Sequence, residues 1–330
     1  MIWLVWRRYR FLIALTVVVL AGLGVWMLLL GHATDAAESS PACRYGAFSC
    51  NTRSGVFSLS DQATAINFLL LFVPCLLGIV FGAPLVAGEF EHSTNRLVWT
   101  QGISRTKWIV VKWCTLGLLL LVLVSALTLI TQWWTGHSEE PSLDLLIIGI
   151  GRLQPLFFPI TGLAMSAYTV FAFAVGAVLG AVIRKTSWAI VGTVVLYAVV
   201  AVVMVLFVRP SLEPQAFQVI NESVSGQGVG DASNSLQASS WNLGFGYRYA
   251  PGALGAKAGP SADVAGQRCQ SGLGPAVYLS CLSAHQIQQG TFYQPANRYW
   301  GLQWRESLLL VATAGALFGV TVLSVRRWKA

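Results

Sequence analysis

The sequence predicts an all-α polytopic membrane protein with six transmembrane helices. Hydrophobic residues make up 55% of the 330 positions, charged residues only 10%, and the mean hydropathy is +0.64. A soluble domain carries about 25% charged residues, so this composition indicates a chain built for lipid. The net charge of +8 does not indicate nucleic-acid binding, because most of the basic residues flank apolar stretches, as orientation in a membrane requires.

Six apolar stretches are long enough to cross a hydrocarbon core of about 30 Å, which takes about 20 helical residues. None of them contains Asp, Glu, Lys or Arg. They are Phe11–Leu30, Ala65–Ala87, Trp113–Trp134, Leu156–Ile183, Trp188–Val208 and Ser307–Val325. The first is too long for the apolar region of a signal peptide and lacks a small-residue cleavage site, which predicts a retained helix. Pro155 and Pro159 predict a bent or re-entrant start of the fourth, since proline cannot donate a hydrogen bond inside a helix.

The distribution of charge predicts that both ends of the chain are cytoplasmic. With the N-terminus inside, the cytoplasmic segments hold 12 of the 21 Lys and Arg in 44 residues, whereas only Glu89 and Glu91 of the 13 acids lie inside. This asymmetry follows the positive-inside rule. The segments are 1–10 inside, 11–30 in the membrane, 31–64 outside, 65–87 in the membrane, 88–112 inside, 113–134 in the membrane, 135–155 outside, 156–183 in the membrane, 184–187 inside, 188–208 in the membrane, 209–305 outside, 306–325 in the membrane and 326–330 inside.

The largest outer segment, 209–305, is predicted to hold a small ordered extracytoplasmic domain, after a Ser/Gly/Gln-rich part that is typical of a flexible loop. Cys43 and Cys50 share the first outer segment, and Cys269 and Cys281 share the last. Each pair is predicted to form a disulfide, because both lie in an oxidising compartment. The alternative is free thiols; a zinc site is disfavoured because neither pair has C-x-x-C spacing with nearby histidines.

Small and polar residues inside the spans suggest how the helices pack and where a path could run. Three Gly-x-x-x-Gly motifs, Gly78/Gly82, Gly176/Gly180 and Gly315/Gly319, predict helix-packing faces. Interior polarity is limited to uncharged groups, and the candidates for lining a path are Asn67, Ser125, Thr128, Ser166 and Thr169. Packing against neighbouring backbone is the alternative for these groups. Spans without charge argue against a proton- or sodium-coupled carrier.

The chain lacks the motifs of the common nucleotide and hydrolase sites. No Lys directly follows a Gly, so a Walker A loop cannot occur. The run Glu89-Phe90-Glu91-His92 would suit a metal or acid/base site of an intramembrane hydrolase. Such a site needs further ligands, and no other span offers a His or carboxylate. We therefore expect neither catalytic residues nor a metal site.

Segment 88–112, which leaves the second span and enters the third, carries a family resemblance. An acidic pair, Glu89 and Glu91, is followed by Ser93-Thr94, apolar Leu97-Val98, Ser104-Arg105 and then Lys112. Ser104 is placed to cap the third helix. This pattern resembles the first cytoplasmic loop of permease subunits of type-2 ABC exporters, with Ser93 at a position where the family often has Gly. The six spans and the large outer segment between the last two are similar as well, most of all to permeases from high-GC Gram-positive bacteria.

The resemblance implies a permease in the bacterial plasma membrane that forms a dimer, with a homodimer expected. Each copy would bind a separate cytoplasmic ATPase, which holds the Mg-ATP, so no cofactor is expected in this chain. The residues expected to couple to the ATPase are Glu89, Glu91, Thr94, Arg96, Leu97, Trp99, Arg105, Lys107 and Lys112. Charge-free spans favour export of an apolar or amphiphilic cargo such as a drug, lipid or peptide. The alternatives are a non-transporting module that moves its extracytoplasmic domain, and an intramembrane hydrolase.

Overall fold

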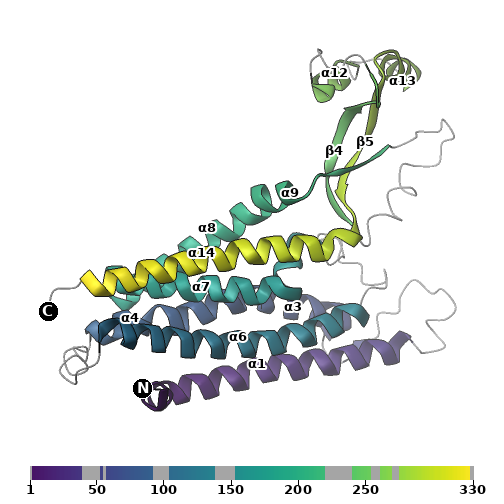
Figure 1. Cartoon of the computed structure of the whole chain (residues 1–330). Helices are drawn as coiled ribbons and strands as arrows, with labels where there is room; N and C mark the ends of the chain where they lie inside the picture. The colour runs from purple at the N-terminus through teal and green to yellow at the C-terminus, as the bar shows by residue number, and fades with distance from the viewer. Residues whose placement is uncertain are drawn as a thin grey trace.

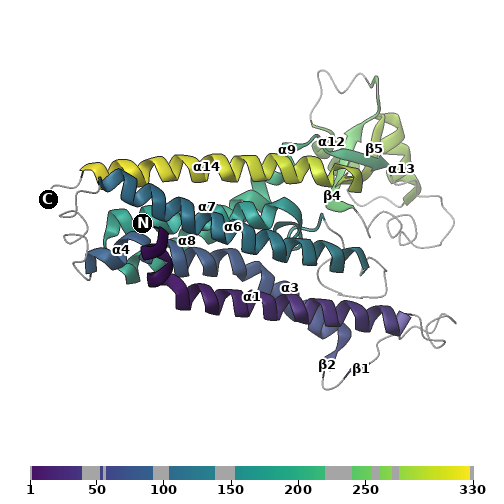
Figure 2. The same cartoon turned by 60° about the horizontal axis from the view of Figure 1, so that its bottom comes forward.

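The long helical segments form an elongated bundle, and a small sheet domain projects from one end of it (Figure 1). The computed structural model describes residues 2–38, 53–54, 57–91, 104–137, 153–219, 240–253, 261–269 and 275–327. Within them, 6 helices are long and apolar enough to cross a membrane. Helix α1 starts and helix α14 ends at the end of the bundle away from the sheet (Figures 1 and 2). We call the two ends of the bundle the termini end and the sheet end.

Four of the six segments are uninterrupted helices, and two are interrupted by a π-helical turn. The uninterrupted ones are α1 (Ile2–Glu38), α6 (Arg105–His137), α7 (Gly162–Ile183) and α14 (Tyr299–Arg327). The second segment joins α3 (Leu59–Leu77), the π turn η1 (Gly78–Gly82) and α4 (Pro84–Glu91). The fifth joins α8 (Thr186–Val203), the π turn η3 (Met204–Val208) and α9 (Arg209–Leu212). Apart from α7, these helical segments therefore extend beyond the predicted apolar spans.

Helix α7 lies at the centre of the bundle, in contact with α3, η1, α4, α6, α8 and α14. The glycine-rich turn η1 packs tightly against it. A Cβ on Gly82 would lie 2.6 Å from the carbonyl oxygen of Phe173, and one on Gly176 would lie 2.7 Å from that of Gly78. Only glycine permits this backbone approach, so the first two predicted packing motifs are confirmed. The third behaves differently: a Cβ on Gly315 or Gly319 would meet no atom of the described chain within 4 Å.

The chain enters α7 through a bend. Residues 153–157 form turns, the 3-10 helix η2 (Phe158–Ile160) follows, and α7 begins only at Gly162, whose φ is +61°. Phe158, Pro159 and Ile160 are buried. The bent start predicted from the two prolines is confirmed, because the regular helix begins six residues after the predicted boundary at Leu156.

The described part of the sheet domain contains three antiparallel strands in the order β3-β5-β4. These are β3 (Ala216–Val219), β4 (Trp241–Tyr249) and β5 (Ile287–Gln294). Two short helices, α12 (Ala262–Cys269) and α13 (Pro275–Ala284), lie at the tip of the sheet (Figure 1), and η4 (Ala296–Arg298) leads into α14. A separate short pair, β1 (Arg53–Ser54) with β2 (Phe57–Ser58), precedes α3. The strands add to the predicted fold class, which the six helices and the disulfide-linked domain confirm.

Candidate functional site

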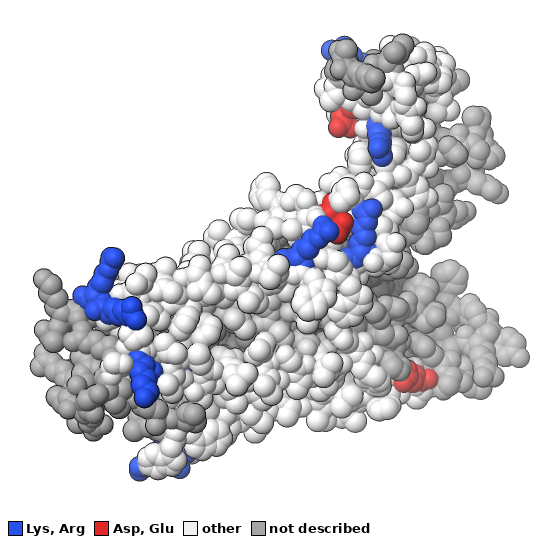
Figure 3. Space-filling view, in the orientation of Figure 1, with Lys and Arg blue, Asp and Glu red and all other residues white. Residues whose placement is uncertain are grey.

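Charged side chains gather toward the ends of the molecule, and the long middle of the bundle shows none on the face in Figure 3. Most described charges are at least partly exposed, but four side chains are buried: Glu89, Lys112, Arg209 and Glu306. A buried charge is costly unless it is paired. Each of the four has an opposite charge as its partner, and the two pairs lie at opposite ends of the bundle.

The first pair belongs to the Glu89 cluster at the termini end, formed by Glu89 of α4, Lys112 of α6 and Arg8 of α1. Oε1 of Glu89, a residue only 2% exposed, accepts hydrogen bonds from Nζ of Lys112 and from Nη1 of Arg8, the latter at 2.6 Å. Lys112 Nζ also lies 4.4 Å from the ring centroid of Trp108. The other oxygen, Oε2, has no hydrogen-bond partner among the described residues. The Glu89 carboxylate thus links α4 to both α1 and α6.

The second carboxylate of the acidic pair has a different partner, which we call the Glu91 clamp. Glu91, the last residue of α4, accepts hydrogen bonds from the backbone nitrogen of Thr186 at 2.9 Å and from its hydroxyl at 2.6 Å. Thr186 is the first residue of α8. A carboxylate is favoured there because it meets unpaired N–H groups and the positive end of the helix dipole. The guanidinium of Arg184, in the turn before α8, lies 5.3 Å from the ring of Phe90.

The second buried pair belongs to the Arg209 cluster at the sheet end. Nε and Nη2 of Arg209 donate to the two oxygens of Glu306 at 2.8 and 2.9 Å, and the Tyr168 hydroxyl donates to the same carboxylate at 2.7 Å. Nη1 of Arg209 donates to the carbonyl of Pro155 at 3.0 Å. Both charged side chains are fully buried. This paired-fork geometry satisfies the buried charges and joins α9, α14, α7 and the bend before α7.

Only part of the predicted coupling segment lies in the described chain. Ser93, Thr94, Arg96, Leu97, Val98 and Trp99 lie outside the described residues. Arg105 begins α6, and Lys107 is exposed. The backbone nitrogen of Lys107 donates to Oγ of Ser104 at 3.3 Å, which confirms the predicted N-cap. Glu89 and Lys112 are brought together and Glu91 is turned toward α8; contact of these residues with an ATPase stays a prediction.

The predicted path residues divide into three groups by their hydrogen bonds. The hydroxyls of Ser125 in α6 and Ser166 in α7 lie 3.3 Å apart, so these two meet across a helix interface. The hydroxyls of Thr128 and Thr169 donate to carbonyls of their own helices, those of Ser125 and Met165. Oδ1 of Asn67 is buried without a hydrogen-bond partner among the described residues. A path-lining role for this set stays a prediction.

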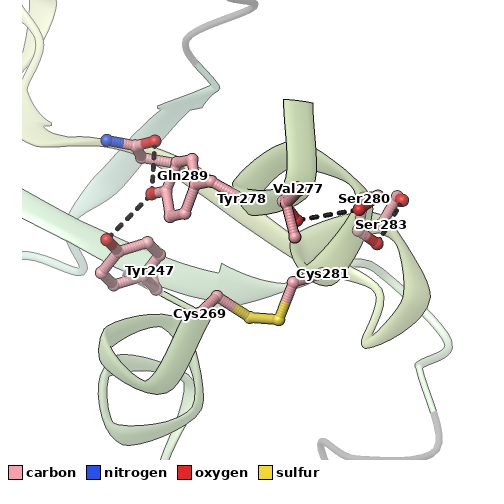
Figure 4. Close-up of a disulfide and its surroundings, with 8 residues drawn as sticks. All are labelled: Tyr247, Cys269, Val277, Tyr278, Ser280, Cys281, Ser283 and Gln289. Atoms are coloured by element: carbon pink, nitrogen blue, oxygen red, sulfur yellow. Dashed lines mark hydrogen bonds between the residues drawn. A yellow bond between two sulfur atoms is a disulfide. The ribbon is translucent and has the colours of Figure 1, made fainter. Parts of the chain in front are cut away.

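The sheet domain is closed by a disulfide between Cys269 and Cys281, with the two Cα atoms 5.7 Å apart (Figure 4). This predicted bond is confirmed; it links the end of α12 to α13. Beside it, the hydroxyls of Tyr247 and Tyr278 lie 3.0 Å apart, and Tyr278 donates to Gln289 of β5 at 2.8 Å. The other predicted pair, Cys43 and Cys50, lies outside the described residues.

The Arg209 cluster and the part played by Arg8 were not predicted from the sequence. Arg209 directly follows the fifth predicted span and Glu306 directly precedes the sixth. Opposite charges at the outer ends of two consecutive spans are a usable signal, because antiparallel neighbours bring those ends together. In the sequence, Arg8 is one of several basic residues that indicate orientation, and nothing local marks it as the partner of a residue 81 positions away.

The apolar bundle with charges paired near its ends defines a multi-pass membrane protein. The family model described as ABC-2 membrane transporter related matches residues 13–209. The match covers more than half of the chain and includes five of the six spans, so the chain belongs to this family of ABC-2 type permeases. It ends at Arg209, so the sheet domain and α14 lie beyond it. The comparisons with curated proteins and with solved structures find no match.

Proposed function

We propose that this chain is the membrane-spanning permease subunit of an ATP-driven exporter, a non-catalytic subunit whose partner ATPase binds and hydrolyses Mg-ATP. The observation that carries the proposal is the family match over residues 13–209, which includes the whole coupling segment 88–112. The class implies an ATPase subunit as partner in general. We further propose two permease copies per assembly and a plasma-membrane location, as the resemblance implies. The excess of Lys and Arg at the termini end supports cytoplasmic chain ends.

The burial pattern supports an apolar or amphiphilic cargo. The buried charges of the described helices occur as ion pairs near the two ends of the bundle, and the polar groups between them are uncharged, such as Ser125, Ser166 and Asn67. A proton- or ion-driven carrier needs titratable groups or ion ligands that change partners at membrane depth. We therefore expect export from energised membranes to persist with a protonophore and to stop when ATP is depleted.

The sharpest test of the proposal is the contact between segment 88–112 and the ATPase. Leu97 is an apolar residue of that segment, and an aspartate there would have to be desolvated at the interface. We expect Leu97→Asp to weaken copurification of an ABC ATPase, identified by mass spectrometry, by roughly tenfold, which corresponds to about 1.4 kcal/mol.

The matched control is Val277→Asp, which makes a similar change at an exposed position of α13 in the sheet domain. It should leave the amount of bound ATPase unchanged. If no ABC ATPase accompanies the wild-type chain, the permease proposal is wrong. If Leu97→Asp binds the ATPase as well as Val277→Asp does, segment 88–112 is not the coupling element.

A further inference from the structure

The fifth helical segment, α8–η3–α9, contacts the bundle along a narrow buried stripe. It is one continuous helical segment over residues 186–212, about 40 Å long at 1.5 Å per residue. Its buried residues form a single narrow stripe: Ala189, Thr193, Met204 and Arg209. Its large apolar side chains point away from the bundle and are exposed, among them Val191, Val195, Val199, Val202, Leu206 and Phe207. Between its two ends the segment packs on α7 along this stripe, where the rings of Tyr197 and Tyr168 lie 6.2 Å apart, and polar contacts are made at both ends.

At the termini end, the Glu91 clamp attaches the start of this segment to α4. Both oxygens of Glu91 are used, one on the backbone nitrogen and one on the hydroxyl of Thr186. Glu91 is also the last described residue before segment 92–103, the part of the chain expected to meet the ATPase. A displacement of the end of α4 therefore pulls directly on the first turn of α8.

At the sheet end, the π turn η3 sets the direction of Arg209. A π turn closes i→i+5 hydrogen bonds and takes one residue more than an α turn. In an uninterrupted α-helix, Val208, four residues after Met204, would continue the buried stripe. Because of the extra residue in the π turn, Arg209 takes that position instead. There it donates to the carboxylate of Glu306, which also accepts from the Tyr168 hydroxyl, and to the carbonyl of Pro155.

The segment is also joined to the sheet. Only residues 213–215 separate α9 from β3. The side chain of Gln294, the last residue of β5, donates to the carbonyl of Glu213 in this connection at 3.0 Å. The guanidinium of Arg209 lies 5.9 Å from the ring of Trp241, the buried first residue of β4. Each strand of the sheet is thus in contact with, or continuous with, the end of this segment.

We propose that α8–η3–α9 is a strut that transmits motion of the end of α4 to the sheet domain, with Glu91 and Arg209 as its two positioning residues. The contacts at each end are polar and directional, whereas the contact with α7 between them is a narrow, largely apolar stripe. The strut itself is a property of this chain; that its motion originates in an ATPase rests on the function proposed above. The sheet domain would then move, or become more or less ordered, whenever the end of α4 moves.

The test measures amide hydrogen exchange by mass spectrometry on the full chain in lipid nanodiscs, with no ATPase present. Glu91→Ala should raise exchange at least threefold at the far end, in α9 and β4, as well as in the first turn of α8. The matched control is Thr106→Val. It removes another hydrogen bond of the termini end, the one from Arg326 Nε to Thr106 Oγ1 at 3.0 Å, without touching α8, and should leave α9 and β4 unchanged.

Thermodynamic coupling is reciprocal, so a change at the sheet end must be felt at the termini end. Arg209→Lys keeps a positive charge beside Glu306 but loses the two-pronged contact with it. It should raise exchange at least twofold at residues 186–189. The strut is refuted if either substitution alters exchange only at its own end, or if Thr106→Val reproduces the effect of Glu91→Ala. Either of these exchange results refutes the strut but leaves the permease proposal intact. Conversely, a wild-type chain that copurifies with no ABC ATPase refutes the permease proposal but leaves the strut intact.

Discussion

Glu89 and Glu91 are two residues apart in the last turns of α4, yet their carboxylates serve different parts of the molecule. Successive side chains of an α-helix are about 100° apart, so residues i and i+2 do not share a face. Glu89 therefore points inward to Lys112 and Arg8, and Glu91 points to the first residue of α8. The same acidic pair thus connects α4 with α1, α6 and α8, which places the end of α4 at a junction of four helices.

At the residue scale, the pair Glu89–Lys112 makes a stability prediction. Glu89→Ala leaves a buried ammonium without its counter-charge, and such a loss costs about 3–5 kcal/mol. We expect the midpoint of thermal unfolding in detergent to fall by roughly 5–10 °C.

The double variant Glu89→Leu/Lys112→Met should recover most of that loss, because apolar groups of similar size replace both charges. Lys107→Met serves as the control, since Lys107 is an exposed lysine of the same helix, and it should change the midpoint very little. A single variant as stable as the double one would show that the buried pair contributes nothing.

At the element scale, the two π turns place residues that a plain α-helix would place elsewhere. In the second segment, η1 brings Gly78, Phe81 and Gly82 into the buried contact with α7. In the fifth, η3 brings Arg209 onto the inward stripe. A π turn inside an α-helix behaves as an extra residue accommodated within one turn, and such turns are frequent at functional sites.

This reading of η3 predicts that a deletion and an insertion at one position have unequal effects. Deleting Phe207, whose side chain is 67% exposed, should convert the π turn to an α turn and keep Arg209 facing Glu306. Inserting one alanine after Phe207 should turn Arg209 away by about 100° and break the buried pair.

We expect the deletion variant to unfold within about 2 °C of wild type and the insertion variant at least about 5 °C lower, measured by thermal unfolding in detergent. Phe207→Ala, which changes the side chain without changing the register, should match wild type. Equal losses for the deletion and the insertion would mean that the π turn does not set the position of Arg209.

At the scale of the whole molecule, the two ends of the bundle differ in charge and in covalent chemistry. The termini end carries exposed basic residues, among them Arg7, Arg10, Lys107, Arg326 and Arg327. The sheet end carries a disulfide-closed domain. Basic ends face the cytoplasm and disulfides form outside it, so both features favour the same orientation.

Orientation is measured by labelling with a membrane-impermeant maleimide in a background where Cys75 and Cys114, the free cysteines of the described chain, are replaced by alanine. Val277→Cys at the sheet end should be labelled in intact cells. Lys107→Cys at the termini end should be labelled only after the membrane is permeabilised, when both sites react. Labelling of Lys107→Cys alone in intact cells would reverse the proposed orientation.

The sequence by itself determined the features that depend on neighbours along the chain. Six spans follow from runs of apolar residues, the Ser104 cap from the residues it precedes, and the bent start of α7 from two prolines. The Cys269–Cys281 bond was accessible too, because the two cysteines are only 12 residues apart in one outer segment. Hydropathy, capping and the closure of short loops depend on residues close together in the sequence. These features can therefore be predicted from the sequence alone.

Only the tertiary structure decided which charges are buried and what they hold. Arg209 and Glu306 are 97 residues apart, and Arg8 and Glu89 are 81 apart. Their pairing depends on which helices lie side by side and on the one-residue shift that a π turn adds, and neither is encoded in a local pattern. The sheet likewise depends on the pairing of β3 with β5, which are separated by more than sixty residues in the sequence. Such contacts follow from the packing of the whole bundle, because a charge that leaves water must be paired with an opposite charge.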